Sequence, residues 1–389
     1  MSNTKEKDSQ FIMSTYGRYN FTVDKAKGSY LYNEDSKECI DFGSGIGTLC
    51  LGSCDDGYIK AVTDQLCKTQ HTSNYFTCKP VVDLAEKIVL LSGLSKVFFA
   101  NSGAEANEGA IKLARKYSND KYGQNRQTII TFQSSFHGRT ITTLAATGQD
   151  VFHQHFFPFT EGFKYCEPNN LDAFSQSLTD DVCAIMFECI QGEGGVNVMN
   201  SDFIKTVYDE CKKRDILVII DEIQTGIGRT GKMFAFQHYD IKPDVITLAK
   251  GLGGGLPIGA VVAAENCCNV LTKGLHGSTF GGNPVSCAAG NYVLDVISGD
   301  GFLDDVTKKG LYIKERLLSL GKDTILEVKG KGLMIGIKTS LPLYEVASKA
   351  LEKGLFVLTA GKDVIRLLPP LNITYEQIDK GLDILSELF

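Results

Sequence analysis

Residues Ile216–Ala263 read ILVIIDEIQTGIGRTGKMFAFQHYDIKPDVITLAKGLGGGLPIGAVVA. Three short apolar runs lie within this stretch, at Ile216–Ile220, Asp244–Ala249 and Ile258–Ala263, and Gly-rich segments separate them. Continuous apolar runs of this length are typical of buried strands in a parallel or mixed sheet. The stretch therefore predicts an α/β fold.

Two charged residues follow two of these runs directly, Asp221 after the first and Lys250 after the second. Chemistry in open α/β sheets sits beyond the carboxyl ends of the strands, so both side chains are expected at one rim. A lysine that forms a Schiff base and a carboxylate that pairs with a protonated pyridine nitrogen are what pyridoxal phosphate (PLP) needs. On this stretch alone, a helix-capping Asp and a solvated Lys are equally consistent.

Composition limits the other possibilities. A chain of 389 residues with 43% hydrophobic content predicts two or three domains with large cores. The net charge of −6 gives no general attraction to nucleic acid or to an anionic membrane. Twelve scattered Cys form no CxxC pair and no zinc signature, so we expect reduced thiols, no metal and a cytoplasmic location. The polar N-terminus lacks a signal-peptide core, and no apolar run is long enough to cross a bilayer.

The flanking regions indicate how the chain is divided. The first twenty residues favour a loose arm, and the alternation over Gly28–Asp41 favours a β-hairpin. Beyond about residue 290, helices alternate with short strands, including Leu355–Thr359 and Val364–Leu368, which is typical of a small α+β domain. We therefore expect an arm and hairpin segment at 1–55, a large cofactor-binding domain at 56–290 and a small domain at 291–389.

Further apolar runs, at Lys96–Ala100, Gln127–Phe132 and Cys183–Phe187, predict three more strands of the large domain. The first runs into Ser102-Gly103-Ala104, at the start of a helix. Free backbone N–H groups at a helix N-terminus make an anion site. Simple N-capping of the helix by Ser102 is the alternative.

The other two strands also end in polar side chains. Phe136 and Arg139 follow the second strand, where they suit stacking on a flat ring and binding a carboxylate. A core Phe and a surface Arg are the alternative, and we interpret the intervening His137 as a packing residue. Glu188 and Glu193 follow the third strand, either in a solvated loop or facing an Arg within a site.

Two later segments carry candidate anion-binding groups. Ser278 and Thr279 lie in a Gly-rich loop, where their hydroxyls could donate to phosphate or carboxylate oxygens. Arg366 alternates with apolar neighbours in a predicted strand. It is either a charge at the strand edge or a second carboxylate-binding group.

Six motifs together resemble one family. They are SGAEANEGAIKLAR at 102–115, FHGRT at 136–140, QGEGG at 191–195, DEIQTGIGRTG at 221–231, KPDVITLAKGLGGGLPIGAV at 242–261 and STFGGNP at 278–284. In this order they are similar to the class III, or ω-amino, aminotransferases of PLP fold type I. The resemblance covers nearly the whole chain from Gly28. It implies a large domain with a mainly parallel seven-stranded sheet flanked by helices, and a smaller α+β C-terminal domain against which the N-terminal segment packs.

The resemblance also implies roles for single residues. Lys250 matches the lysine that holds pyridoxal 5′-phosphate, and Asp221 matches the acid at the pyridine nitrogen. The remaining cofactor-binding positions implied are Ser102, Gly103, Ala104, Phe136, Glu188, Glu222, Ile223, Gln224 and Thr279. Thr279 matches a residue that reaches the phosphate of the neighbouring subunit, which implies a homodimer.

Substrate contacts follow in the same way. Arg139 matches the group that binds the substrate's distal carboxylate, and Arg366 matches the group that binds the α-carboxylate of the keto acid. Glu193 matches the acid that neutralises Arg366 while the ω-amino substrate is bound. Ser278 and Asn74 match further positions that touch substrate.

The wording of the motifs and the HTSN loop at 71–74 imply a preference within the family: transfer of the δ-amino group of N2-acetyl-L-ornithine to 2-oxoglutarate. Ornithine, succinylornithine and 4-aminobutyrate are the alternative donors. Two departures from the family occur, at Gly52–Gly57, where a Gly-His-x-His-Pro run is common, and at Ala104, where Thr is common. A nucleotide-dependent dehydrogenase is a poorer interpretation, because Gly251–Gly255 lacks the GxGxxG spacing.

Overall fold

The computed structural model describes residues 4–389 and contains a seven-stranded sheet with the order β4-β12-β11-β10-β7-β5-β6. The strands β5, β6, β7, β10 and β11 pair in parallel, and β12 is antiparallel to both of its neighbours. The predicted α/β class and the mainly parallel seven-stranded sheet are therefore confirmed. The strands are β4 (Lys96–Ala100), β5 (Thr128–Phe132), β6 (Phe163–Cys166), β7 (Val182–Phe187), β10 (Leu217–Asp221), β11 (Val245–Leu248) and β12 (Gly259–Ala263).

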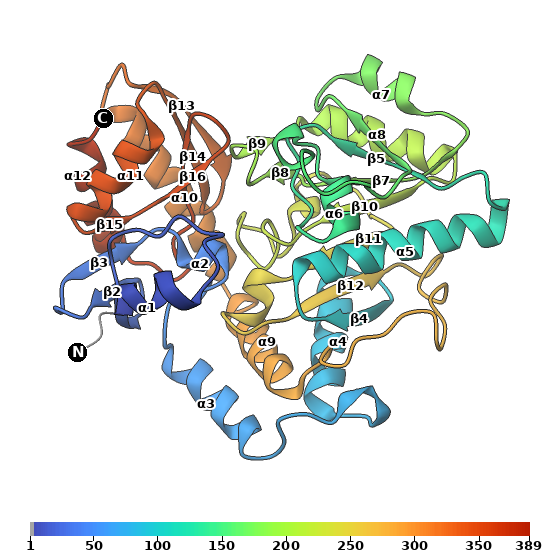
Figure 1. Ribbon diagram of the computed structural model, residues 1–389, viewed down its shortest axis with the longest axis horizontal. Helices are drawn as coiled ribbons and strands as arrows, with labels where there is room; N and C mark the ends of the chain where they lie inside the picture. The colour runs from blue at the N-terminus through green and yellow to red at the C-terminus, as the bar shows by residue number, and fades with distance from the viewer. Residues whose placement is uncertain (1–3) are drawn as a thin grey trace.

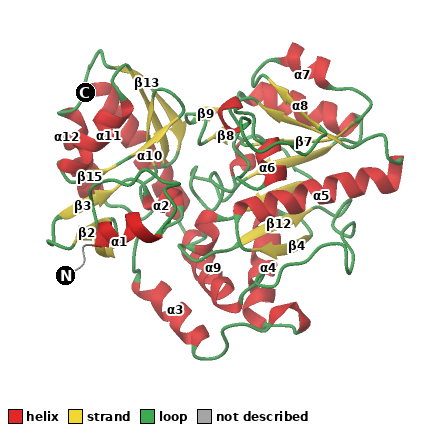
Figure 2. Ribbon diagram, viewed as in Figure 1, coloured by secondary structure: helices red, strands yellow, loops and turns green. Residues whose placement is uncertain are grey.

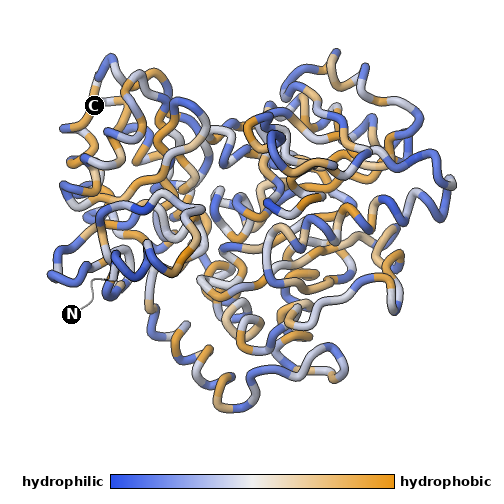
Figure 3. The backbone as a smooth tube through the Cα atoms, in the orientation of Figure 1, coloured by the Kyte–Doolittle hydropathy of each residue, from blue (hydrophilic) through white to orange (hydrophobic). Residues whose placement is uncertain are grey.

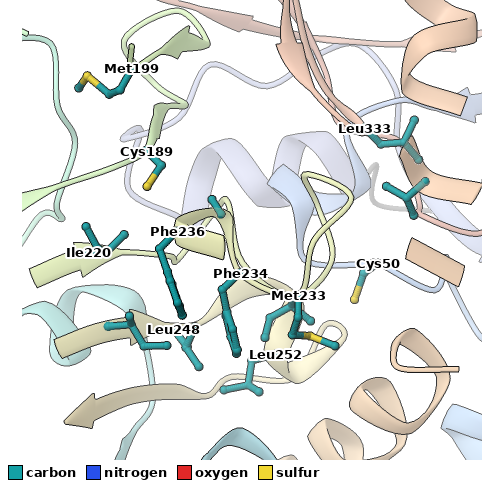
Figure 4. Packing of buried hydrophobic residues seen from close by; sticks show 14 of the residues in the cluster. Cys50, Cys189, Met199, Ile220, Met233, Phe234, Phe236, Leu248, Leu252 and Leu333 are labelled. Carbon is teal, nitrogen blue, oxygen red and sulfur yellow. The ribbon is translucent and has the colours of Figure 1, made fainter. Parts of the chain in front are cut away.

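The three runs that suggested this sheet form three adjacent strands of it, β12, β11 and β10. Every residue of β10, β11 and β12 is buried, as expected for strands covered on both faces. The parallel register pairs Asp221 with Thr247, so β10 and β11 end at the same rim. Figure 4 shows part of the core around this rim, where Phe234 and Phe236 lie near Leu248 and Leu252.

Helices cover the large sheet, and α5 and α8 run along it in Figures 1 and 2. In Figure 3 the strands are mostly orange, whereas the distal end of α5 is blue, in keeping with a buried sheet and a solvated helix end. The helices of this region are α3 (Asp56–Leu66), α4 (Lys79–Ser92), α5 (Gly103–Tyr122), α6 (Ile141–Ala146), α7 (Leu171–Ser177), α8 (Ser201–Lys213) and α9 (Pro284–Ile297), with the 3₁₀ helices η1 (Ser73–Tyr75), η2 (Asp150–Phe152), η3 (Ala235–His238) and η4 (Lys250–Gly253). A two-stranded ribbon is formed by β8 (Ile190–Gln191) and β9 (Asn197–Val198).

The C-terminal part forms a second layered unit, at the left of Figure 1. Its four-stranded sheet has the order β13-β14-β17-β16 and is packed by helices on its outer side. The elements are α10 (Phe302–Ser319), β13 (Ile325–Lys331), β14 (Met334–Thr339), α11 (Leu343–Glu352), β16 (Leu358–Ala360), β17 (Val364–Leu367) and α12 (Tyr375–Ser386). The proposed boundary at 290/291 lies within α9, which is continuous through it.

The N-terminal hairpin adds to this second unit. β1 (Val23–Lys27), β2 (Tyr30–Asn33) and β3 (Glu38–Asp41) form a sheet whose fourth strand is β15 (Leu355–Phe356), paired in parallel with β3. The single strand expected over Leu355–Thr359 is therefore wrong, because the chain contributes β15 to one sheet and β16 to another. Val357, between them, is buried where the chain passes from sheet to sheet.

The N-terminal arm is more ordered than expected. Residues Thr4–Phe11 form the helix α1, none of whose side chains is buried, and Ser44–Gly47 form the short α2. The expectation of a loose arm is wrong for α1, whose polar sequence carries no apolar periodicity to indicate a helix. The part of the expected arm at residues 1–3 lies outside the described residues. Within residues 4–389, no helix combines the length and apolar character needed to cross a membrane.

Candidate active site

A cavity of about 550 Å³ opens at the carboxyl ends of β7, β10 and β11. Most of the residues singled out in the sequence line it, although they come from five separate segments. They are Ser102, Gly103, Ala104, Phe136, Arg139, Glu188, Glu193, Asp221, Ile223, Gln224 and Lys250. A carboxylate and an amine therefore meet in one hollow, as the two strand ends predicted.

Asp221 is held by a buried network at the floor of this cavity. Its Oδ2 accepts a hydrogen bond from Nδ2 of Asn107 at 2.9 Å and lies 2.8 Å from Nδ1 of His137. The backbone N–H of Ile223 donates to Oδ1 at 3.0 Å. These partners fix the orientation of the carboxylate, which is 3% exposed.

Two members of this network were not expected from the sequence. His137 was interpreted as a packing residue, but its buried ring contacts Asp221 and lines the cavity, and its Nε2 has no hydrogen-bond partner. Asn107 also donates to the backbone oxygen of His137 at 2.7 Å. A polar Asn on the buried face of α5 was the only signal in the sequence.

Lys250 begins the 3₁₀ helix η4 and has φ +44°, in the left-handed region that a non-glycine residue rarely adopts. Such strain is characteristic of functional sites, where the surrounding structure over-determines it. Desolvation lowers the pKa of Lys250, and the nearby Arg366 lowers it further, whereas the carboxylates of Glu193 and Asp221 oppose the shift. A lowered pKa increases the fraction of neutral amine, the form that acts as a base or nucleophile.

The N-terminus of α5 forms another wall. Ser102 is the N-cap, and its hydroxyl accepts the backbone N–H of Glu105 at 3.2 Å, so the capping alternative applies to this side chain. Gly103 and Ala104 follow as the first helical residues, whose N–H groups have no intrahelical partner. A Cβ added to Gly103 would lie 2.8 Å from Cδ1 of Ile223, so glycine is needed for this close approach. The helix end presents donors and a positive dipole to the cavity.

A charged network closes one side of the cavity. Arg366, on β17, donates to both oxygens of Glu193 at 2.7 and 3.1 Å and to Oε1 of Gln224 at 3.0 Å. Gln224 in turn donates to Glu193 at 3.1 Å. Burial alone would raise the pKa of Glu193, but the Arg366 guanidinium lowers it to about 2. Arg366 is therefore neither at an open strand edge nor free, because its charge is neutralised within the site.

Arg139 is exposed at the mouth of the cavity, where its contacts are with rings. Its Cζ lies 5.5 Å from the ring centroid of Phe136 and 4.2 Å from that of Phe152. Among the described residues, no carboxylate forms an ion pair with Arg139. Its N–H groups are thus available to an anionic ligand.

Five of the expected site residues do not line the cavity, and one of them is Arg366, which contacts the lining residues Glu193 and Gln224. Glu222 is buried, and Thr225 Oγ1 and the backbone N–H of Phe236 donate to its carboxylate. Thr279 is exposed, and Ser278 accepts from Nδ2 of Asn101 at 3.0 Å. Asn74 donates to the backbone oxygens of Ser278 and Gly281, so it holds this loop.

Glu188, Tyr16 and Thr48 also contribute to the cavity wall. Glu188 accepts backbone N–H groups from Phe136 at 3.0 Å and Gly192 at 3.2 Å, so its carboxylate braces the cavity wall. Burial raises the pKa of Glu188. Tyr16 and Thr48 also line the cavity but were not expected, because the segments that carry them show no strand or helix period.

The chain is similar to known proteins over its whole length. Residues 12–389 match the sequence family described as Aminotransferase class-III. An acetylornithine aminotransferase from Haemophilus ducreyi is 49% identical over 387 residues, which cover 99% of this chain and 98% of that relative. One from Bacillus subtilis is 43% identical over 378 residues and 97% of each chain.

Solved structures agree with these sequence matches. An N-acetylornithine aminotransferase from Stenotrophomonas maltophilia superposes with a TM-score of 0.84 at 34% identity, covering 96% of each chain. An ornithine aminotransferase from Toxoplasma gondii, described with partial occupancy of PLP at its active site, gives a TM-score of 0.94 at 30% identity. That superposition covers 99% of this chain and 93% of the other.

Proposed function

Because the chain belongs to the class III aminotransferases and is a PLP-dependent transaminase, we propose that it moves the δ-amino group of N2-acetyl-L-ornithine to 2-oxoglutarate. The products are N-acetyl-L-glutamate 5-semialdehyde and L-glutamate, in a step of arginine biosynthesis. The 49% identity to an acetylornithine aminotransferase supports this donor. The ornithine aminotransferase structures share the fold at about 30% identity.

The residues present fit PLP. The N-terminus of α5, at Gly103 and Ala104, supplies donors for a phosphate, and the buried Asp221 supplies a carboxylate for a pyridine nitrogen. His137 Nε2 is a buried polar atom without a partner in this wall, as expected where a polar ligand completes the hydrogen bonding. Ile223 and Phe136 line the same cavity and suit the two faces of a flat ring.

When bound, PLP supplies the chemistry of amino transfer, because its ring accepts electrons from the substrate carbon and its carbonyl carbon carries the amino group between substrates. Asp221 keeps a proton on the ring nitrogen by offering it a carboxylate that Asn107 and His137 hold in place. Lys250 would hold the cofactor, and its amine would move a proton at the substrate carbon. Its lowered pKa favours the neutral amine that this step needs.

One observation supports the choice of substrates. The site has two arginines in different states: Arg366 is buried and paired with the lining residue Glu193, whereas Arg139 lines the cavity and has no carboxylate partner among the described residues. N2-acetylornithine brings one carboxylate, which Arg139 can bind. 2-Oxoglutarate brings two, so Glu193 must release Arg366 to bind the second. A single site can thus accept both substrates in turn, which predicts ping-pong kinetics.

We also propose a cytoplasmic homodimer. Thr279 is exposed and does not line the cavity of its own chain, so it can serve a phosphate only if a second copy presents it. Ser278 and Asn74 hold the loop that carries it. The division into segments 1–55, 56–290 and 291–389 remains our proposal, supported by the pairing of β3 with β15.

A panel of amino donors tests the function directly. The purified holoenzyme is mixed with N2-acetylornithine, ornithine, succinylornithine or 4-aminobutyrate in the absence of a keto acid, and the cofactor spectrum is followed for half-transamination. N2-acetylornithine should give the highest rate constant divided by half-saturation concentration. A higher value for ornithine would replace the proposed donor, and a ternary-complex pattern in steady-state kinetics would reject the two-step mechanism.

A further inference from the structure

The loop that follows α6 places an aromatic ring against Arg139. Phe152 ends the 3₁₀ helix η2, and its ring centroid lies 4.2 Å from the Arg139 guanidinium. Phe136 lies on the same guanidinium at 5.5 Å, and the two rings meet edge to face with centroids 6.0 Å apart. Two aromatic rings thus surround a cation whose N–H groups have no carboxylate partner among the described residues.

The ring of Phe152 is itself held in place. The neighbouring His153 contacts the backbone oxygen of Leu144 in α6 through Nε2 at 2.9 Å and packs on Phe159 and Tyr165. The hydroxyl of Tyr165 donates to the backbone oxygen of Ala145 at 2.6 Å. These contacts tie η2 to the helix that begins just after Arg139, so the position of Phe152 is coupled to that of the arginine.

Stacking affects what the arginine can bind. An exposed arginine side chain loses much rotamer freedom when a ligand immobilises it. A guanidinium stacked on rings is already restricted, and its N–H groups, which lie in its own plane, stay available for a carboxylate. Phe152, Arg139, Glu193 and Lys250 also line one cavity of about 1420 Å³ that continues outward from the site.

We propose that Phe152 is a positioning residue that sets substrate affinity by holding the Arg139 guanidinium ready for the substrate carboxylate. The inference rests on the proposed function of Arg139 as a carboxylate-binding group. Phe152 lies outside the six motifs, in a loop that the sequence analysis did not predict to be part of the site.

Three variants test it on the holoenzyme. Phe152→Leu removes the ring and keeps apolar bulk, Phe152→Tyr keeps the ring, and Phe156→Leu is a matched control. Phe156 is an exposed aromatic residue of the same segment, and it packs edge-on to His155. Phe152→Leu should raise the KM for 2-oxoglutarate and for the amino donor about tenfold, or ~1.4 kcal/mol, with kcat within about twofold. Phe152→Tyr and Phe156→Leu should keep both KM values within about twofold of the parent enzyme.

A double-mutant cycle shows whether Phe152 acts through Arg139. In an Arg139→Gln background, Phe152→Leu should cause no further fall in kcat/KM for 2-oxoglutarate. A further fall of the same size as in the parent enzyme would overturn the proposal, as would an unchanged KM in Phe152→Leu or a loss confined to kcat. A parent-like kcat/KM in Arg139→Gln alone would instead reject Arg139 as the carboxylate-binding group, so the two failures are distinguishable.

Discussion

Arg366 and Glu193 form a two-pronged ion pair beside the active-site cavity, with N–O distances of 2.7 and 3.1 Å. Arg366 comes from β17 of the C-terminal unit. Glu193 lies in the loop between β8 and β9, the ribbon that follows strand β7 of the large sheet. The pair therefore joins the two units of the chain beside the cavity that Glu193 lines. In this paired state the charge of Arg366 is neutralised by Glu193.

Replacing Glu193 should favour one substrate over the other. Glu193→Gln removes the negative charge that neutralises Arg366, so the KM for 2-oxoglutarate should fall several-fold, while the KM for N2-acetylornithine should rise or stay unchanged. Separate half-reactions measured by stopped-flow absorbance check this, with the exposed Glu161→Gln as the control. An equal change in both half-reactions would contradict the gating role of Glu193.

Lys250 should be indispensable. Lys250→Ala removes both the group that binds the cofactor and the base, so kcat should fall by at least about 10³-fold, near the upper range for a positioned acid–base group. Covalent retention of the cofactor after borohydride treatment, detected by mass spectrometry, should also vanish. The exposed Lys242→Ala should retain both properties. Retention in Lys250→Ala at another lysine would show that the assignment is wrong.

Thr279 should affect cofactor binding only in a dimer. Thr279→Ala should raise the Kd for PLP about tenfold or more, because a hydrogen bond to a charged group contributes about 1.5–3 kcal/mol. Sedimentation should give a dimer for this variant and for the parent. Thr272→Ala, an exposed threonine nearby in the chain, is the matched control. A monomeric holoenzyme with full PLP affinity would refute the shared site.

Glu222 should make stability depend on pH. Burial raises its pKa from the ordinary 4.5 to about 7. The folded protein then binds a proton that the unfolded chain has lost, so this contribution is complete below about pH 4.5 and is lost as the pH rises to about 7. Replacement by Gln removes the titration.

The urea-unfolding free energy of Glu222→Gln, relative to the parent, should therefore increase between pH 5 and pH 8, by about 2–3 kcal/mol at most. The exposed Glu86→Gln should show no such trend. A difference between Glu222→Gln and the parent that is constant across this pH range would exclude the titration of Glu222 as the cause.

Arg229 should be a stability residue. Its buried guanidinium donates from Nη1 to the backbone oxygens of Leu333 at 3.0 Å and Pro369 at 2.5 Å, which join the loop after β10 to the C-terminal unit. Arg229→Met leaves both oxygens without this donor, at about 1–3 kcal/mol each. The midpoint of urea unfolding should fall accordingly, whereas the exposed Arg214→Met should leave it nearly unchanged. A stable Arg229→Met protein would show that other donors replace the guanidinium.

The sequence predicted those parts of the fold that local pattern determines. β10, β11 and β12 are continuous apolar runs because both faces of the sheet are covered, so their positions were predicted within a residue or two. β6 was missed because it is the sheet's last strand and includes the exposed Tyr165, which leaves no apolar run. The break between β15 and β16 at Val357 was missed because no glycine, proline or polar turn residue marks it.

Some site residues could likewise be predicted from local sequence, whereas others are defined only by tertiary contacts. Lys250 and Asp221 were predicted because strand ends and charges are both visible in the sequence. The contacts of Asp221 with Asn107 and His137 are tertiary, and they join residues separated by 114 and 84 positions. The interpretation of His137 as a packing residue was reasonable from its surroundings but missed this contact. The sequence also gave no reason to expect that Arg139 would rest on Phe152.

The parallel pairing of β3 with β15 has a consequence for synthesis of the chain. Lys37 donates to the backbone oxygen of Glu352, a partner 315 residues later. The strand β3 is translated early, but β15, which covers its edge, is translated near the end of the chain. An uncovered strand edge can pair with other chains. We therefore expect the edge of β3 to stay unpaired in the nascent chain until the segment that carries β15 has left the ribosome.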